Sequence, residues 1–292
     1  SVTRPSLRNS INTFSYFFFR YLPDASQTLN IAYKPYSAQI ATTSETENIL
    51  LIFGESLYSQ HIQLYGYNRQ TFPRMEKRIK SNPEWQIASG ISGGIATATS
   101  TLLFFNGIRE PANHNELQSK TANIFRLAKQ AGYKTYYFSN QESRLTMSFG
   151  AKNVDEIITN DMKLIFFSKY HDEGLAKLLN EIDFTTGKHF VVLHMRSPHS
   201  PFENRYKGRE AEFEKFKPAA ESKDRFTYYQ NTYDNALLYT DMAIDSMVAE
   251  FEKLNQGKNY SIYITADHGE LINYNGMYGH NNLVIEQAKV PF

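Results

Sequence analysis

Ionisable side chains follow two apolar runs that lie far apart in the chain. Glu55 follows the run at 48–53 with one glycine between them, and Asp267 and His268 follow the run at 261–265 with one alanine between them. Carboxylates and imidazoles are ligands for hard or borderline divalent ions, and Zn²⁺ with oxygen and nitrogen ligands is the leading candidate. Cysteine is absent from the 292 residues, which excludes a thiolate site. These residue types predict a metal-dependent enzyme.

Asp267 and His268 can reach one ion only where the chain turns, because adjacent side chains of a strand face opposite ways. The end of a strand provides such a turn. His280 follows in a stretch that contains several glycines, and glycine lets the backbone fold closely around a site. The structural alternative for His280 is a capping or surface histidine.

A hydroxyl nucleophile is available in the Ser- and Thr-rich stretch 92–101. Metal coordination and a helix N-terminus both lower the cost of an alkoxide, so a Ser or Thr just before the apolar segment 102–105 is a candidate. Ser56, beside Glu55, is a rival, and a Gly/Ser/Thr loop with an N-cap is the structural alternative for 92–101. Chemistry alone leaves this choice open.

Strand and helix patterns alternate along the chain from residue 48. Apolar runs predict the strands, and apolar positions with helical spacing predict the helices. Their alternation predicts an α/β fold in which a mostly parallel central sheet is flanked by helices on both faces. The predicted strands are 48–53, 85–88, 134–138, 189–193 and 261–265, and the predicted helices are 121–131, 170–182 and 232–254.

The predicted topology brings the ionisable residues to one place. Open parallel sheets bind ligands at the carboxyl ends of their strands. Glu55 follows the first predicted strand, His194 and His199 follow the strand 189–193, and Asp267 follows the last. We therefore expect the residues from these three strands to meet at one edge of the sheet.

Composition excludes some classes of partner. Lys and Arg total 31 against 30 Asp and Glu, a formal charge of +1, so the chain lacks the basic footprint of a nucleic-acid-binding protein. The aromatic cluster at 14–22 is shorter than the roughly 20 residues that span a bilayer. We interpret it as packing on its own domain, with a lipid interface as the alternative. The charged stretch 203–229 is either a solvated surface excursion or a substrate-side flap.

Seven ordered blocks of this sequence resemble the phosphoethanolamine transferases of Gram-negative bacteria. That group includes the mobile colistin-resistance enzymes and belongs to the alkaline phosphatase and sulfatase superfamily. The resemblance covers most of residues 48–292. Its blocks are Gly54–Ser56, Tyr65–Pro73, the Thr97 segment, His194–His199, Phe213–Pro218, Asn231–Asp241 and Asp267–His280.

The resemblance implies roles for individual residues. Thr97 is implied as the nucleophile, and Glu55, Thr97, Asp267 and His268 as the ligands of a catalytic zinc ion. His199 and His280 resemble histidines that hold the phosphate or a second zinc ion, and His194 lies in the same loop as His199. Asn140 sits where the family has a polar substrate-contacting loop, although the match there is loose.

Two departures from the family pattern affect the domain interpretation. Relatives carry several disulfides, each typically worth about 2–4 kcal/mol, whereas this chain has no cysteine. The family's N-terminal transmembrane helices are also missing, and relatives continue beyond Phe292. We therefore expect a soluble periplasmic portion of a bacterial inner-membrane protein, with residues 1–46 as a membrane-proximal leader and 47–292 as a C-terminally truncated sulfatase-like catalytic domain.

The resemblance also implies a reaction. It is zinc-dependent transfer of phosphoethanolamine from phosphatidylethanolamine to a lipid A or inner-core acceptor, through a phospho-threonine intermediate. A monomer without nucleic-acid partners is expected. A phosphoglycerol transferase or phosphodiesterase of the same superfamily is the alternative. A sulfatase is disfavoured because the Thr97 segment lacks the Cys/Ser-x-Pro-x-Arg context of its nucleophile. A non-catalytic glycolipid-binding domain is a further alternative, against which the intact set of site residues argues.

Overall fold

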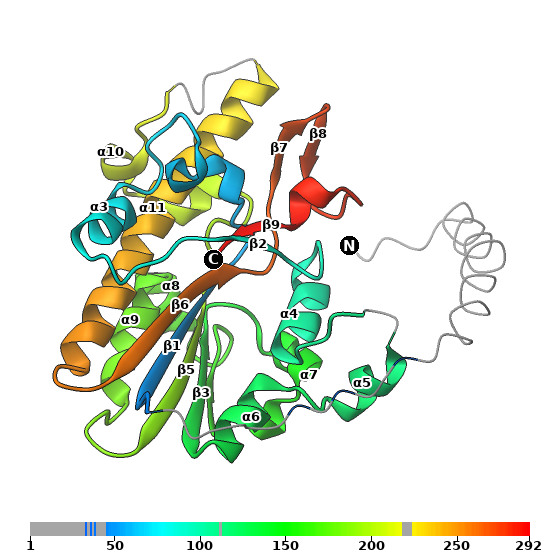
Figure 1. Cartoon of the computed structure of the whole chain (residues 1–292). Coiled ribbons are helices and arrows are strands. Elements are labelled where there is room, and N and C mark those ends of the chain that lie inside the picture. Colours follow the sequence, from blue (N-terminus) through cyan, green and yellow to red (C-terminus); the bar gives the residue numbers. More distant parts are fainter. Residues whose placement is uncertain (1–32, 34–35, 37, 39–44, 111–112, 218–223) are drawn as a thin grey trace.

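Five parallel strands form the central sheet of the computed structural model (Figure 1), which describes residues 33, 36, 38, 45–110, 113–217 and 224–292. Their spatial order is β4-β3-β5-β1-β6, and each neighbouring pair is parallel. The α/β class and the parallel sheet predicted from the sequence are confirmed. The strands are Asn48–Gly54 (β1), Tyr133–Ser139 (β3), Glu156–Ile158 (β4), Lys188–His194 (β5) and Tyr260–Ala266 (β6).

The register of these strands places the carboxyl ends of four of them side by side. Phe53 of β1 lies opposite His194 of β5, and Gly54 lies opposite Ala266 of β6. Ser139 of β3 is also level with His194. The loops that follow β1, β3, β5 and β6 therefore leave the sheet at one height.

Helices cover both faces of the sheet (Figure 1), and alternate residues of β1 belong to two separate cores. Leu50 and Ile52 belong to the larger core, whereas Leu51 and Phe53 belong to the smaller one. The larger core involves α3 (Pro73–Ser81), α8 (Leu164–Tyr170), α9 (Glu173–Leu178), α10 (Glu210–Phe213) and α11 (Arg225–Leu254). The smaller core involves α4 (Thr97–Phe105), α6 (Ile124–Gln130) and α7 (Thr146–Phe149), and α5 (His114–Ser119) lies nearby.

Short elements complete the described chain. Two antiparallel pairs are formed by β2 (Ser89–Ile91) with β9 (Lys289–Pro291) and by β7 (Leu271–Tyr274) with β8 (Met277–Gly279). Single 3₁₀ turns are Ser59–His61, Gln63–Tyr65, Ser143–Leu145, Ala151–Asn153, Leu179–Glu181, Phe202–Arg205 and Ile285–Ala288. Within the described ranges, no helix combines the length and the apolar character that crossing a membrane requires.

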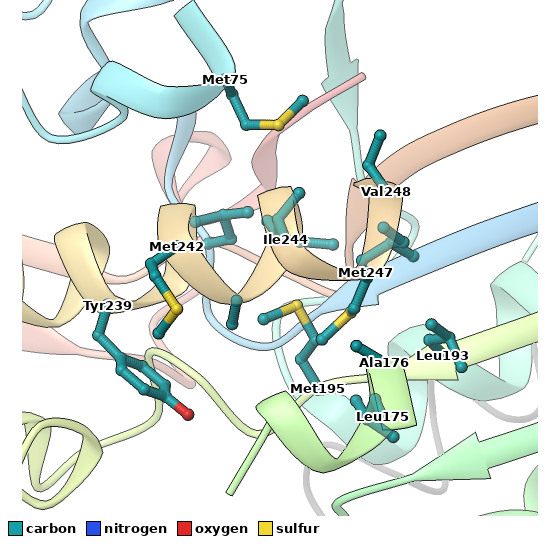
Figure 2. Close-up of a cluster of buried hydrophobic side chains, with 14 of the residues drawn as sticks. Met75, Leu175, Ala176, Leu193, Met195, Tyr239, Met242, Ile244, Met247 and Val248 are labelled. Carbon is teal, nitrogen blue, oxygen red and sulfur yellow. The ribbon is translucent and has the colours of Figure 1, made fainter. Parts of the chain in front are cut away.

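The long helix α11 holds the centre of the larger core. Figure 2 shows Met247 of α11 close to Met195, in the loop after β5, and to Leu175 of α9, whereas Ile244 lies on the side of α11 toward Met75 of α3. All five side chains are buried. The predicted end of this helix at residue 254 is confirmed, but the predicted start at 232 is wrong. The helix begins at Arg225 because the Asp224 carboxylate accepts from the first free N–H groups, those of residues 226 and 227.

Three other predicted elements differ from the structure. No strand forms at 85–88, since the ladder with β9 begins at Ser89. The predicted helix 170–182 is shorter in the structure, where α9 covers Glu173–Leu178 and a 3₁₀ turn follows it, and His171, with a φ of 48°, separates α9 from the end of α8 at Tyr170. The helix predicted from residue 121 starts at Ile124, where the side chain of Asn123 caps it. The predicted leader at 1–46 lies almost wholly outside the described residues.

The charged stretch 203–229 is not one continuous loop. It contains the turn Phe202–Arg205, the short helix α10 and the first turn of α11. The Asn235 side chain of α11 accepts from the N–H groups of Lys215 and Phe216, each at 2.9 Å. The part of this stretch that precedes residue 218 is therefore fastened to the core helix.

A buried tyrosine of α11 supports the loop that follows β1. The hydroxyl of Tyr233 donates to the carbonyl of Ser56 at 2.8 Å and accepts from the N–H of Tyr58 at 2.9 Å. Ser56 has a φ of 54°, a backbone conformation that non-glycine residues rarely adopt. The hydroxyl therefore helps to hold a strained turn directly beside Glu55.

Replacing this hydroxyl is expected to destabilise the chain. In Tyr233→Phe, two buried backbone groups lose their partner, so the free energy of unfolding should fall by about 1–3 kcal/mol in chemical denaturation. The matched control is Tyr263→Phe, since Tyr263 is 47% exposed on β6 and the change should stay within about 0.5 kcal/mol. Equal stability of the two variants would contradict the support role.

Candidate functional site

Glu55, Asp267 and His268 come together where β1 and β6 end. Their ligand atoms all lie within 4.8 Å of one another, and all three residues are buried. Nε2 of His268 is 3.5 Å from Oε1 of Glu55 and 3.4 Å from Oδ2 of Asp267. Among the described residues, this is the group of acidic and imidazole side chains whose geometry suits a metal ion.

Backbone groups orient the Asp267–His268 pair. Oδ1 of Asp267 accepts from the N–H of Ser56 at 2.9 Å and from the N–H of His268 at 2.7 Å. Oδ2 of Asp267 is buried and has no hydrogen-bond partner among the described residues. Nδ1 of His268 lies 2.9 Å from the carbonyl of Gly269, a contact that places the ring proton on Nδ1 and the lone pair on Nε2. An unpartnered buried carboxylate oxygen facing an imidazole lone pair fits a cation.

Glu55 is held from both sides. The hydroxyl of Ser56 donates to Oε1 at 2.8 Å, and Nε2 of Gln141 donates to Oε2 at 2.7 Å. Gln141 is itself fixed, because the same Nε2 donates to the carbonyl of Met195 at 3.0 Å. The loops after β3 and β5 thus set the orientation of the carboxylate that follows β1.

Thr97 brings a hydroxyl to the same place. It is the first residue of α4, and its Oγ1 is 3.2 and 3.1 Å from the two oxygens of Glu55 and 3.4 Å from Nε2 of His268. The approach to α4 depends on Gly94, where a Cβ would lie 2.8 Å from the backbone nitrogen of Ser100. The structure thus places the predicted nucleophile and the three predicted protein ligands in one cluster, and their catalytic roles stay predictions.

A second group of histidines lies next to this cluster. The ring of His280 is 5.0 Å from that of His268 and 5.9 Å from that of His199, measured between centroids. Oε2 of Glu270 lies 3.0 Å from Nδ1 of His280, and Oε1 of Glu270 accepts from the hydroxyl of Tyr229 at 3.0 Å. The hydrogen bond with Glu270 raises the pKa of His280. The contact with Glu270 thus favours the protonated form of the imidazole beside the metal cluster.

His194 and Asn140 bond to protein groups in the interior. His194 is fully buried, its Nδ1 lies 2.6 Å from the hydroxyl of Tyr137, and burial lowers its pKa to about 4. The amide of Asn140 donates to Asp172 at 2.8 Å and accepts from Asn160 at 2.7 Å. Both side chains hold neighbouring parts of the chain together in this structure, and their contact with substrate stays a prediction.

Sequence reasoning missed Gln141, Glu270, Tyr229 and Asp172 as contributors to the site. Gln141 lies next to Asn140 in a loop already singled out, and Glu270 ends the Asp-His-Gly-Glu block, so both had a local signal. Asp172 is fully buried and accepts from the N–H groups of Arg196 and Ser197, each at 2.9 Å. It lies inside a stretch with helical periodicity, where no chemical pattern distinguished it.

The electrostatics of the cluster favour bound protons until a cation replaces them. Burial, and then the neighbouring charge of Glu55, raise the pKa of Asp267 to about 7. Burial disfavours the charged form of His268, but the carboxylates of Asp267 and Glu55 outweigh it and raise the pKa of that imidazole. Near neutral pH the metal-free cluster therefore retains protons that a divalent ion must displace.

Comparison with known proteins assigns the chain to a family. The family model described as Sulfatase matches residues 47–292. The chain belongs to the sulfatase family. Strands β1 and β6 and the Thr97 helix all lie inside the matched range, so this sulfatase-family domain contains the whole metal cluster.

The curated relatives share only about a quarter of their residues with this chain over the matched range. Phosphoethanolamine transferase EptC of Escherichia coli K12 is 24% identical over 238 residues, which are 78% of this chain and 40% of the relative. The chain thus spans about two-fifths of that relative's length.

Solved structures share the fold. The C-terminal periplasmic domain of phosphoethanolamine transferase EptC from Campylobacter jejuni superposes with a TM-score of 0.66 at 22% identity, covering 85% of this chain and 79% of that one. The corresponding Escherichia coli domain in complex with Zn superposes at 0.64 and 20% identity, over 85% and 72% of the two chains. These superpositions show that the fold is shared.

Zn²⁺ affinity is expected to rise with pH and then level off. Below about pH 7 Asp267 keeps a proton that Zn²⁺ must displace, and the raised pKa of His268 acts in the same direction. Affinity should change by about tenfold per pH unit for each proton released, measured by chelator competition between about pH 5 and pH 8. Asp267→Asn should weaken binding and flatten the slope. Asp241→Asn is the control, because burial also raises the pKa of Asp241 to about 7, but this residue of α11 accepts hydrogen bonds from the first turn of α3 and is not part of the cluster. A pH-independent affinity would contradict the arrangement.

Gln141 is expected to control how well Glu55 binds a metal. Gln141→Leu keeps the volume but removes the donor to Oε2, so Zn²⁺ affinity should fall by about 10–100-fold. Gln130→Leu, at an exposed position near the end of α6, is the matched control and should leave affinity unchanged. Circular dichroism of the metal-free variants checks that both retain the fold. Equal affinities would exclude a positioning role for Gln141.

Proposed function

We propose that this chain is the catalytic part of a zinc-dependent phosphoethanolamine transferase. In this proposal, phosphatidylethanolamine is the donor, a lipid A or inner-core glycolipid is the acceptor, and Thr97 carries the phosphoethanolamine group between them. The observation that carries it is the position of the Thr97 hydroxyl, 3.1 and 3.2 Å from the Glu55 oxygens and 3.4 Å from Nε2 of His268. The proposal draws its donor from the name of the relatives, which are called phosphoethanolamine transferases.

The residues that would hold one catalytic Zn²⁺ are Glu55, Thr97, Asp267 and His268. They offer three oxygens and one imidazole nitrogen, a donor set that Zn²⁺ accepts. The unpartnered Oδ2 of Asp267 supports the assignment, and so does the Zn complex of an EptC domain with the same fold. When bound, the ion lowers the pKa of the coordinated hydroxyl and neutralises charge on the phosphoryl oxygens.

The first half of the reaction forms a bond from Oγ1 of Thr97 to the donor phosphorus. The proton of the Thr97 hydroxyl passes to the Glu55 carboxylate, which accepts a hydrogen bond from it and returns the proton in the second half. The bond between phosphorus and the glycerol oxygen breaks, and the leaving diacylglycerol oxygen takes a proton from His280. Glu270 keeps this imidazole protonated and oriented, and His199 donates to a phosphoryl oxygen.

In the second half of the reaction, His280 accepts a proton instead of donating one. The acceptor hydroxyl gives its proton to the imidazole of His280, which the first half left neutral, and its oxygen attacks the phosphorus held by Thr97. The bond to Oγ1 of Thr97 breaks, and the threonine recovers its proton. If the acceptor group is a phosphate, its oxygen attacks already ionised, and the imidazole of His280 takes its proton from water before the next turnover.

The alternatives use much of the same chemistry. A phosphoglycerol transferase or a phosphodiesterase would keep the cluster and change the donor or replace the acceptor by water. Sulfate-ester hydrolysis, despite the family's name, is disfavoured because residues 95–101 contain neither Cys nor the Pro and Arg of that nucleophile's context. We further propose that the chain acts as a monomer at the periplasmic face of a bacterial inner membrane, in line with the periplasmic domains that share its fold.

The decisive measurement is the mass of the zinc-loaded protein after incubation with phosphatidylethanolamine and no acceptor. A phosphoethanolamine adduct that peptide mapping places on Thr97 is the expected result. Thr97→Ala should give no adduct, whereas Thr97→Ser should restore part of it because a hydroxyl is present again. An adduct on Ser56, or adduct formation by Thr97→Ala, would sink the nucleophile assignment. Head-group release without any adduct would favour the phosphodiesterase.

A further inference from the structure

The ring of Tyr229 contacts both of the segments that carry the histidines next to the metal cluster. Its centroid is 5.0 Å from that of Phe202, which follows His199 by three residues. It is 5.2 Å from the centroid of Tyr278, which precedes His280 by two residues. Both contacts are edge-to-face, an arrangement that aromatic pairs favour. One ring of α11 thus joins the loop after β5 to the β7–β8 hairpin.

The hydroxyl of Tyr229 acts on His280 by a second route. It donates to Oε1 of Glu270 at 3.0 Å, and Oε2 of Glu270 lies 3.0 Å from Nδ1 of His280. Burial, and then the charge of Glu270, raise the pKa of Tyr229, so the phenol keeps its proton and is the donor. Because Glu270 is buried, loss of this donor would leave Oε1 without a partner among the described residues. The orientation of the carboxylate, and with it that of the imidazole, therefore depends on the tyrosine hydroxyl.

The hairpin needs such a contact at one strand more than at the other. Figure 1 shows the β7–β8 hairpin beside the N-terminal half of α11. The first two residues of β7, Leu271 and Ile272, are buried, whereas all three residues of β8 are half-buried. Tyr278 belongs to β8, and His280 follows directly after this strand ends at Gly279. Tyr229 therefore contacts the strand that the core fixes less firmly and that leads into His280.

We propose that Tyr229 is a positioning residue for phosphoryl transfer. Its ring sets the separation of the segments that carry His199 and His280, and its hydroxyl sets the orientation of the His280 imidazole through Glu270. The two histidine rings lie 5.9 Å apart, close enough for both to contact the oxygens of one phosphoryl group. The proposal rests on the proposed function in one respect, since there these histidines act on the phosphoryl and leaving oxygens. Tyr229 itself takes no part in making or breaking a bond.

The role of the ring can be tested without catalysis, because the chain has no cysteine and two introduced cysteines are unique label sites. Asn204→Cys, in the turn after β5, and Tyr274→Cys, on the hairpin, place spin labels at exposed positions. In the metal-free protein, their dipolar interaction should report one narrow separation. Tyr229→Leu should broaden it, whereas Tyr229→Phe, which keeps the ring, and Tyr263→Leu, at a 47% exposed position of β6, should not. An unchanged separation in Tyr229→Leu would overturn the role of the ring.

The role of the hydroxyl can be tested with two donor substrates that differ in their leaving group. Glycerophosphoethanolamine releases a basic alkoxide that needs a proton, whereas the 4-nitrophenyl ester of phosphoethanolamine releases a phenolate that does not. In single turnovers of the zinc-loaded protein, Tyr229→Phe should slow the first substrate by about 10–100-fold and the second by less than about threefold. The control is Tyr274→Phe, on the same hairpin and 36% exposed, which should change neither rate.

The pair of substrates separates positioning from a general structural role. Equal slowing of both substrates by Tyr229→Phe would show only a structural role and would overturn the proposal. Undiminished turnover of both substrates would overturn it as well. If the unmodified chain turns over neither substrate, the proposed function fails, while the spin labels still decide whether Tyr229 sets the separation of the two segments.

Discussion

Two buried carboxylates converge at the end of the sheet, and much of the surrounding structure compensates for their mutual repulsion. Glu55 and Asp267 are both enclosed, and each would be costly to ionise without partners. Backbone N–H groups serve Asp267, a hydroxyl and an amide serve Glu55, and His268 stands between them. One carboxylate oxygen remains without a partner among the described residues, so the proposed cation would complete an arrangement that the protein groups leave open.

Other buried carboxylates also accept hydrogen bonds from the segments around them, through backbone or side-chain groups. Asp172 accepts from two N–H groups of the loop after β5, and Asp241 accepts from two N–H groups in the first turn of α3. Asp234 binds His61, Tyr67 and Arg69. The loops that carry the site are therefore held by specific bonds as well as by packing, which keeps the side chains of the cluster in fixed positions.

The sequence predicted what depends on local pattern and missed what depends on long-range contact. Apolar runs located β1, β3, β5 and β6 to within about two residues, and the carboxyl-edge rule then predicted that Glu55 would meet Asp267 and His268. The start of α11 was missed because one capping residue, Asp224, outweighed the apolar periodicity on which the prediction relied. Gln141 and Asp172 could not be chosen from the sequence, since their roles arise from partners 86 and 24 residues away.

The anchoring side chains of α11 have a consequence for how the chain can change. Tyr233, Asp234 and Asn235 hold three different segments, and Asp241 holds a fourth. On a rigid helix, one inserted residue rotates everything beyond it by about 100°. An insertion between Asn235 and Asp241 would therefore turn the fourth anchor away while the other three stayed in place. The six-residue spacing from Asn235 to Asp241 is therefore fixed by the segments that these side chains hold.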